Sequence, residues 1–345
     1  MYITNKDGIS RTTVRGKNIM VYHQQWLNWT DTKPPDLQVV IDSLAESNTF
    51  NHGSIFTQKA VVEFILDITG YRSSENLSQM TLLDPSCGKG AFLSVAIERL
   101  LNSYYQCYGT YQHITSHLQN AIRAVELHKE TMSSARTSIL AQFIKRGISS
   151  YDALKLIDTW LIQDDFLLTD FSFHFTHIVG NPPYIRQELL PDILLYYYKK
   201  RYETIYDRAD LYIPFIERSL SLLDSHGQLA FICPDRWMKN RYGGPLRALI
   251  SRDYHLQHYI DMTNANAFQE NVIAYPAIFV ITPQQGTGAT IIHQPPLAIE
   301  NLQEILHPDQ HNSEVVTHIA KSSQPWIFNS SLEEHTLNGS SRIFL

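Results

Sequence analysis

The chain has 345 residues, of which 43% are hydrophobic and 18% are charged, as in globular rather than disordered proteins. It contains no run of about 18 or more uncharged apolar residues, so no transmembrane helix is predicted. The formal net charge of -6 gives no overall attraction to nucleic acid, so any such binding needs a local basic patch or a partner.

The first residues, "MYITNKDGISRTTVRGK", lack the apolar core of a secretory signal. The three cysteines, Cys87, Cys107 and Cys233, form neither a CxxC spacing nor a disulfide framework. The 15 histidines show no HExxH pattern and no Cys/His cluster, so no metal site is expected. These features favour a cytoplasmic protein without membrane association.

Predicted strands and helices alternate along most of the chain. Apolar residues at helical spacing predict helices at 60–71, 91–106, 132–147 and 210–227, the last ended by Gly227. Short strands are predicted at 80–84, before a glycine turn, and at 121–127, 161–168, 176–184, 228–234, 256–263 and 274–282. This alternation predicts an α/β fold with a doubly wound, mostly parallel sheet. After about Thr282 the sequence turns polar, His-rich and acidic, which suggests a domain boundary.

Polar residues follow the first two of these strands, where doubly wound sheets bind their ligands. "LLDPSCGKGAF" supplies Asp84 and two glycines, Gly88 and Gly90, which let a ligand approach the backbone closely. Glu126 ends the next strand, at roughly the distance downstream where a ribose-binding acid is expected.

The next two strands end in the same way. In "IQDDFLL", Asp164 or Asp165 is placed to accept a hydrogen bond from an adenine amino group, and Phe166 to flank the base. In "HIVGNPPYIRQE", two prolines end a strand beside Asn181 and Tyr184. Each stretch alone also fits a structural role, as a tight turn, a solvated acid or a helix cap. Their common order and spacing favour a pocket for an adenosine-like ligand.

Three motifs resemble those of amino-group DNA methyltransferases. "LLDPSCGKGAFL" resembles their S-adenosylmethionine motif, "GNPPY" resembles their catalytic motif, and "HGSIFTQKAVVEFIL" looks like the Gly-x-x-Tyr/Phe-Thr-Pro element over the cofactor. Their order is that of gamma-class adenine methyltransferases of the Eco57I and TaqI type. The sequence departs from the pattern at Gln58, where the family usually has Pro, and at His128, where an acid often follows the ribose-binding Glu.

The resemblance implies a Rossmann-like sheet of seven strands with helices on both faces. It covers residues 48–282 as the catalytic domain, after an N-terminal extension at 1–47 and before a polar C-terminal segment at 283–345. The cofactor-binding residues that it implies are Thr57, Asp84, Pro85, Cys87, Gly88, Gly90, Glu126, Asp165 and Phe166.

The resemblance also gives the Asn-Pro-Pro-Tyr loop a chemical role in methylating an adenine amino group. The side chain of Asn181 and the carbonyl of Pro182 would accept the amino hydrogens, with Pro183 stiffening the loop. Tyr184 would stack on the flipped base. Phe268 resembles a second stacking residue, although a place in the core fits it equally well.

Basic and aromatic residues follow the catalytic loop and suggest a surface that grips double-stranded DNA. The candidates are Arg186, Lys199, Lys200, Arg201, Arg236, Lys239 and Arg241. Interspersed acids, such as Glu203, leave a solvated helix face as the alternative. The segment after Thr282 has only two fixed positive charges, Lys321 and Arg342, and no repeated strand pattern. We therefore expect a separate specificity subunit, or a further target-recognition domain in a longer chain.

The predicted function is site-specific adenine methylation of DNA in a restriction-modification or phage-defence system. Cytosine C5 methylation is disfavoured because the chain lacks a Pro-Cys pair. Methylation of a protein glutamine or of RNA adenine remains an alternative, since related enzymes share the Asn-Pro-Pro-Tyr loop. A catalytically silent subunit of a defence complex is a further alternative.

Overall fold

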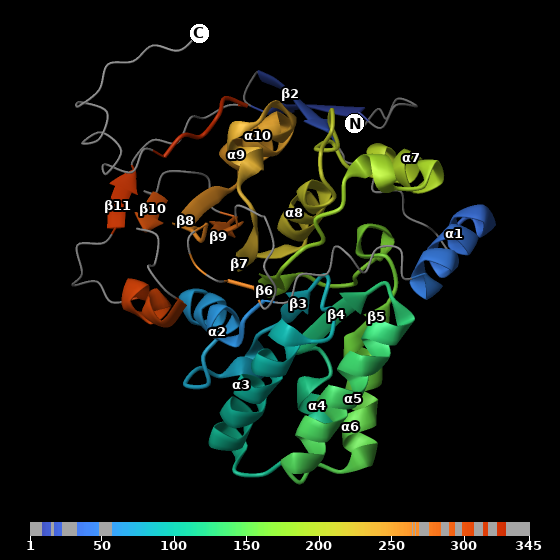
Figure 1. Ribbon diagram of the computed structural model, residues 1–345, viewed down its shortest axis with the longest axis vertical. Coiled ribbons are helices and arrows are strands. Elements are labelled where there is room, and N and C mark those ends of the chain that lie inside the picture. Colours follow the sequence, from blue (N-terminus) through green and yellow to red (C-terminus); the bar gives the residue numbers. More distant parts are fainter. Residues whose placement is uncertain are drawn as a thin grey trace.

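The computed structural model describes residues 9–14, 17–22, 33–47, 57–263, 265, 267–268, 276–283, 290–293, 299–306, 313–316 and 323–328. These residues form a nine-stranded sheet. Figure 1 shows helices packed against it. A separate antiparallel pair joins β1 (Ile9–Val14) to β2 (Lys17–Tyr22). No helix in the described ranges is long and apolar enough to cross a membrane.

The large sheet has the strand order β11-β10-β8-β9-β7-β6-β3-β4-β5. Its strands are β3 (Leu82–Asp84), β4 (Ile122–Glu126), β5 (Leu161–Gln163), β6 (Phe175–Gly180), β7 (Leu223–Pro234), β8 (His255–Asp261), β9 (Pro276–Thr282), β10 (Thr290–His293) and β11 (Ser313–Val316). The pairs β3–β4, β3–β6, β4–β5, β6–β7 and β8–β10 are parallel, and β7–β9, β8–β9 and β10–β11 are antiparallel. The predicted mostly parallel α/β class is confirmed. The expected seven strands were too few, because β10 and β11 extend one edge.

Successive strand residues point to opposite faces of the sheet, and helices cover both faces. Leu82 and Val179 belong to one core cluster, whereas Leu83 and Ile178 belong to the other. The first cluster includes residues of α2 (Lys59–Ile68), α3 (Ala91–Tyr108), α4 (Ile114–Leu118), α5 (Lys129–Lys145) and α6 (Ser150–Trp160). The second includes residues of α1 (Pro35–Glu46), α7 (Asp192–Arg201), α8 (Tyr212–Ser221), α9 (Arg236–Lys239) and α10 (Gly244–Asp253).

Several local predictions were wrong in extent. The strand predicted at 161–168 ends at Gln163, because the side chain of Asp165 accepts a bond from Leu167 N and starts a short 3₁₀ turn, η3 (Phe166–Leu168). The helix expected to end at Gly227 ends at Ser221, and Gly227 lies inside β7. A Cβ at Gly227 would lie 2.6 Å from the carbonyl oxygen of Phe175, so the paired strands leave no room for a side chain there. The remaining 3₁₀ turns are η2 (Leu77–Gln79), η4 (Gln187–Leu189), η5 (Arg241–Gly243) and η6 (Ile299–Leu306).

The short described stretch at 323–328 packs against α9 and α10. Trp326 is 2% exposed, and its ring meets that of Trp237 edge-on with centroids 5.5 Å apart. The buried guanidinium of Arg247 donates to the carbonyl oxygens of Ser323 at 2.6 Å and Gln324 at 2.9 Å. These carbonyl groups compensate the cost of burying the Arg247 charge, and the bonds attach residues 323–328 to α10.

Candidate active site

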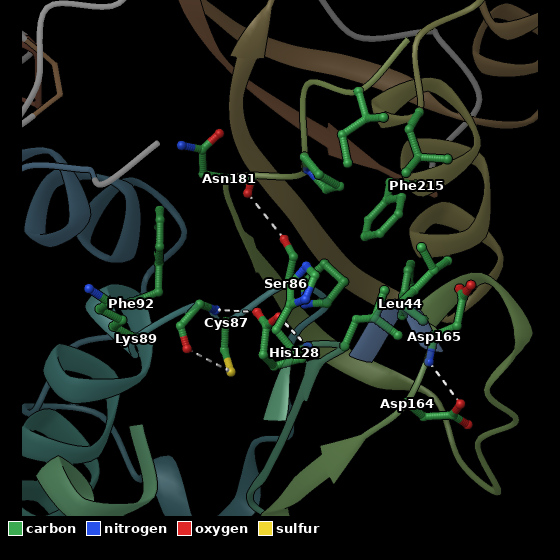
Figure 2. A pocket seen from close by; sticks show the side chains of 18 of the residues that line it. Leu44, Ser86, Cys87, Lys89, Phe92, His128, Asp164, Asp165, Asn181 and Phe215 are labelled. Carbon is green, nitrogen blue, oxygen red and sulfur yellow. Dashed lines mark hydrogen bonds between the residues drawn. The ribbon is translucent and has the colours of Figure 1, made fainter. Parts of the chain in front are cut away.

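A cavity lies at the carboxyl ends of β3, β4, β5 and β6 (Figure 2). The chain passes from β3 to β4 and β5 on one side and then returns to β6 on the other, so the cavity sits at the switch point of the sheet. Its lining includes the predicted residues Thr57, Pro85, Cys87, Gly88, Glu126, Asp165, Phe166, Asn181 and Pro183. It also includes Leu44 of α1 and Leu194 and Tyr198 of α7, which were not predicted.

The turn after β3 depends on two glycines with left-handed backbone conformations. Gly88 has a φ of 55°, and Gly90, which precedes α3, has a φ of 91°. A side chain at either position would be strained whatever space surrounds it. Cys87 N donates to the carbonyl oxygen of Val125 at 2.9 Å, which fixes the turn against β4. Burial, with the nearby Asp84 carboxyl, raises the pKa of the Cys87 thiol and keeps it protonated rather than nucleophilic.

The Glu126 carboxylate joins the ends of β3 and β4. Its Oε2 accepts the N–H of Gly88 at 3.0 Å, and its Oε1 accepts the N–H of His128 at 2.9 Å. Glu126 is 9% exposed, and burial raises its pKa while the two backbone N–H groups oppose that shift. Each oxygen keeps a lone pair with which a ligand hydroxyl can bond.

Asp84 ends β3 with its carboxyl group almost fully buried, at 1% exposure. Ser86 N donates to Oδ1 at 3.3 Å, whereas Oδ2 contacts no hydrogen-bonding group in the described part of the chain. Burial raises the pKa of Asp84 to about 8. A buried acceptor of this kind suits a cationic partner, which would restore its ionised form. Asp84 itself does not line the cavity, although its neighbours Pro85 and Ser86 do.

Asp164 and Asp165 follow β5 at one end of the cavity, as Figure 2 shows. Asp165 Oδ1 accepts the N–H of Leu167 at 2.9 Å, and Oδ2 accepts the hydroxyl of Tyr198. Asp164 Oδ1 accepts the ammonium of Lys33. Burial raises the pKa of Asp165 to about 6, against the opposing effects of Tyr198 and Lys33. The two acids therefore have different partners, from α7 and from the residues before α1.

The Asn-Pro-Pro-Tyr loop begins directly after β6. Ser86 Oγ donates to the main-chain oxygen of Asn181 at 3.1 Å, the bond drawn at the top of Figure 2. The side-chain amide of Asn181 donates to Thr57 Oγ1 at 3.3 Å, although the two residues are 124 positions apart. Thr57 and the turn residue Ser86 thus hold the side chain and the main chain of Asn181, a role for Ser86 that the sequence did not reveal.

The two predicted base-stacking residues are placed differently. Tyr184 is partly buried, its ring meets Tyr212 edge-on with centroids 6.2 Å apart, and its hydroxyl donates to the carbonyl oxygen of Ile232 at 3.2 Å. Phe268 is 9% exposed and belongs to the core, while its backbone bridges to Thr57. Neither ring lines the cavity.

The departure at Gln58 has a local consequence. Gln58 N donates to the carbonyl oxygen of Ala267 at 3.0 Å, and the side-chain amide of Gln58 donates to the carbonyl oxygen of Phe268 at 3.2 Å. A proline at this position could make neither bond. The described part of the Thr57 element is therefore tied to residues 267–268, while residues 52–56 of that motif lie outside the described ranges.

Most of the predicted basic residues are exposed, namely Arg186, Lys199, Lys200, Arg236, Lys239 and Arg241. Arg201 is an exception, since its side chain is 1% exposed and pairs with Asp170 at 2.5 Å. The structure therefore does not place Arg201 on a DNA-contacting surface. It lies on the buried face of α7 with Leu194 and Tyr198.

Two of the exposed cations lie against tyrosines. The ammonium of Lys200 is 4.4 Å from the ring centroid of Tyr196, and the guanidinium of Arg241 is 6.0 Å from that of Tyr206. In each pair an exposed cation lies against the ring of a partly exposed tyrosine. In the described ranges no three His, Cys, Asp or Glu side chains are grouped to hold a metal ion.

Comparison with known proteins places the glycine-turn motif and the Asn-Pro-Pro-Tyr loop in one family. Residues 75–268 match the family model described as Eco57I restriction-modification methylase. The chain is 44% identical over 287 residues to the type II methyltransferase M.PaeR7I of Pseudomonas aeruginosa, covering 81% of this chain and 50% of that protein. It is 42% identical over 286 residues to M.XhoI of Xanthomonas vasicola, covering 80% and 52%. The chain thus spans about half the length of these curated relatives.

Solved structures share the fold at low sequence identity. The type ISP restriction-modification enzyme LlaGI, in complex with a DNA substrate mimic, aligns with a TM-score of 0.59 at 16% identity, covering 89% of this chain and 35% of that one. A modification subunit of a putative type I restriction enzyme from Vibrio vulnificus aligns with a TM-score of 0.56 at 14% identity, covering 84% and 61%.

Proposed function

Because the chain belongs to the Eco57I restriction-modification methylase family, as its motifs predicted, we propose that it methylates DNA. In this proposal the acceptor is the exocyclic amino group of adenine in a specific sequence. The methyl donor is S-adenosylmethionine, and the setting is a cytoplasmic restriction-modification system. The observation that carries the proposal is that Asn181, Glu126 and Asp165 line one cavity at the switch point of the sheet.

The cavity residues fit S-adenosylmethionine group by group. Glu126 offers remaining lone pairs to ribose hydroxyls, and Asp165 offers them to the adenine amino group. Asp84 lies behind the cavity wall formed by Pro85 and Ser86, and its buried Oδ2 would attract the ammonium of the methionine end from there. The left-handed turn at Gly88 lets the backbone approach the ligand. When bound, the cofactor supplies an electrophilic methyl group on a positively charged sulfur.

The catalytic step in this proposal relies on acceptors that are fixed before reaction. The adenine amino group is a poor nucleophile because its lone pair is delocalised into the ring. Asn181 Oδ1 and the Pro182 carbonyl oxygen would accept its two hydrogens and stabilise the positive charge that develops on nitrogen. Thr57 and Ser86 support this geometry, because each holds one part of Asn181.

The target base must leave the duplex, which costs a few kcal/mol in unstacking and unpairing. An aromatic face returns about 1–3 kcal/mol per base. Tyr184 is proposed for this contact, because its hydroxyl bond to Ile232 O fixes the ring at the end of the catalytic loop. Phe268 would take part only after leaving the core, since its ring is buried.

Sequence recognition is assigned in this proposal to a separate subunit or to a further segment of a longer chain. The curated relatives are about twice as long as the region that this chain matches. The structural neighbour from Vibrio vulnificus is described as a subunit. The exposed cations near the catalytic loop, including Lys199, Lys200 and Arg241, would contribute non-specific contacts to phosphates.

The test is transfer of a labelled methyl group to DNA, followed by nucleoside analysis for N6-methyladenine. The purified chain is assayed alone and with the product of a neighbouring gene at physiological salt, with RNA and a release-factor-like protein as competing substrates. Site-specific methylation of adenine only with the added product supports both parts of the proposal. Efficient site-specific methylation by the chain alone refutes the need for a partner. Methylation of RNA or protein instead of DNA refutes the function.

A further inference from the structure

The two neighbouring acids after β5 are bound in different ways. Asp164 Oδ1 accepts Asp165 N at 2.8 Å and the ammonium of Lys33, while Oδ2 accepts Thr169 Oγ1 at 3.1 Å. Three protein donors therefore occupy this carboxylate. Asp164 acts as a structural anchor between its own loop and the residues that precede α1.

Asp165 has fewer protein donors and is more deeply buried, at 6% exposure. Each of its oxygens accepts one fixed donor, Leu167 N on Oδ1 and the Tyr198 hydroxyl on Oδ2. A carboxylate oxygen accepts two hydrogen bonds, so each keeps one position for a ligand. With both oxygens held, the carboxylate cannot rotate, and it meets the cavity that Tyr198 also lines.

We propose that Tyr198 and Lys33 are positioning residues that hold Asp165 as a pure hydrogen-bond acceptor, and so make the pocket select a purine with an exocyclic amino group. This inference rests on the proposed function, because it assumes that the nucleoside end of the cofactor meets Asp165. Tyr198 acts on Asp165 directly. Lys33 acts through Asp164, which it keeps in its structural role.

Selection follows from matching donors with acceptors. An adenine amino group donates to a fixed carboxylate, whereas the 6-oxo group of hypoxanthine presents an acceptor and is repelled. Sites built around a hydrogen bond of this kind discriminate strongly, because the wrong ligand leaves buried polar groups unpaired. A protonated Asp165 would lose this discrimination, since its O–H could donate to the 6-oxo group.

The groups facing Asp165 determine when that proton is taken up. Tyr198 faces it from α7, Tyr202 from the residue after that helix, Lys33 from the residues before α1, and Asp164 from its own loop. Burial and the Asp164 charge raise the pKa of Asp165, and the Tyr198 hydroxyl and the Lys33 charge lower it, giving about 6. Removing either Tyr198 or Lys33 should therefore raise the pH at which selectivity is lost.

Tyr198→Phe removes only the hydroxyl that bonds to the carboxylate. Tyr202→Phe is a matched control, because Tyr202 follows the last residue of α7 and its hydroxyl donates to the main-chain oxygen of Leu167 instead. Both variants lose one buried hydrogen bond, so general destabilisation should be similar. Lys33→Met tests the other positioning residue without altering α7, and it keeps the test decisive if Tyr198→Phe fails to fold.

The experiment is calorimetric binding of S-adenosylhomocysteine and S-inosylhomocysteine between pH 5 and 8, which needs no catalysis. The wild type and Tyr202→Phe should prefer the adenosine ligand at neutral pH and lose that preference below about pH 6. Tyr198→Phe and Lys33→Met should reduce the preference by on the order of tenfold at neutral pH and lose it at higher pH.

The inference would be overturned if the folded Tyr198→Phe and Lys33→Met variants showed the same ligand preference and the same pH dependence as the wild type. The proposed function would then still stand. Equal loss in Tyr198→Phe and Tyr202→Phe would also overturn it, because the effect would then reflect packing of α7. A wild type that binds neither nucleoside would refute the proposed cofactor and this inference together.

Discussion

Gly88 and Glu126 are joined by a hydrogen bond of 3.0 Å from the backbone N–H of Gly88 to the carboxylate, 38 residues further along the chain. The other oxygen of Glu126 accepts the N–H of His128. One side chain therefore sets the spacing between the turn after β3 and the turn after β4, which form adjacent walls of the cavity.

Glu126→Gln should weaken binding of S-adenosylhomocysteine by about 10–100-fold. The glutamine amide carries one acceptor oxygen, so its NH₂ group must face one of the two backbone N–H groups and leave it unpaired, at about 1–3 kcal/mol. Calorimetry and a melting curve measure both effects. Glu98→Gln, on the exposed side of α3, is the control. Wild-type affinity in Glu126→Gln would contradict the assigned role.

Asn181→Ala should lower the single-turnover methyl-transfer rate by at least about 10²-fold while cofactor affinity stays near that of the wild type. The lost acceptor acts mainly on charge that develops during reaction, and removal of one preorganised group typically costs this much. A transfer rate close to that of the wild type would rule out the proposed mechanism.

Thr57→Val should lower the same rate by a smaller factor. Valine keeps the shape of threonine but cannot accept the bond from the Asn181 amide, so Oδ1 would lose its fixed direction. Thr57→Ser is the matched control, because it keeps the hydroxyl. Equal rates for the valine and serine variants would show that the hydroxyl does not orient Asn181.

Asp84→Asn should make the ligand-free protein more stable at pH 8 while weakening cofactor binding. The folded-state pKa of Asp84 is about 8, above its usual value of 3.8. Between these values the carboxyl ionises in the unfolded chain but stays protonated in the native state, so the free energy of unfolding falls as the pH rises. The variant's gain should be small near pH 4 and largest near pH 8. Urea denaturation at several pH values measures it, and a constant gain across the range would disprove the burial argument.

The His258 and His293 rings should make stability fall in mild acid. Their nitrogens are 3.0 Å apart, and burial lowers both pKa values from 6.5 to about 4. As the pH falls from 6.5 towards 4, the unfolded chain takes up protons before the native state does. The stabilising contribution of the neutral histidines is therefore fully present above pH 6.5 and is lost in that window. His293→Gln should flatten this dependence, whereas the same change at the exposed His226 should not.

Much of the fold and the shape of the site could be predicted because the signals are local. Each parallel strand ends in a turn whose glycines, acids or prolines stand next to one another in sequence, as in Asp84 to Gly90. The buried face of α7 was also readable in principle. Leu194, Tyr198 and Arg201 stand at helical spacing, which separates Arg201 from the exposed Lys199 and Lys200.

The remaining features depend on contacts between distant residues. The bond from Lys33 to Asp164 spans 131 positions, and that from Tyr198 to Asp165 spans 33. No local pattern marks Tyr198 among the 19 tyrosines. Strands β10 and β11 have four residues each, too short for an alternating pattern, and they form by pairing with an existing edge.

The binding cavity extends beyond the region that matches the family model, since its lining residue Leu44, on α1, precedes residue 75, as does Lys33, which binds the lining residue Asp164. A ligand in the cavity touches α1, so its binding energy is also available to keep α1 docked. At a free concentration of 100 times its dissociation constant, a ligand raises the free energy of opening of any element that its binding requires by about 2.7 kcal/mol. Amide hydrogen exchange in α1 should therefore slow on ligand binding and report directly on cofactor occupancy.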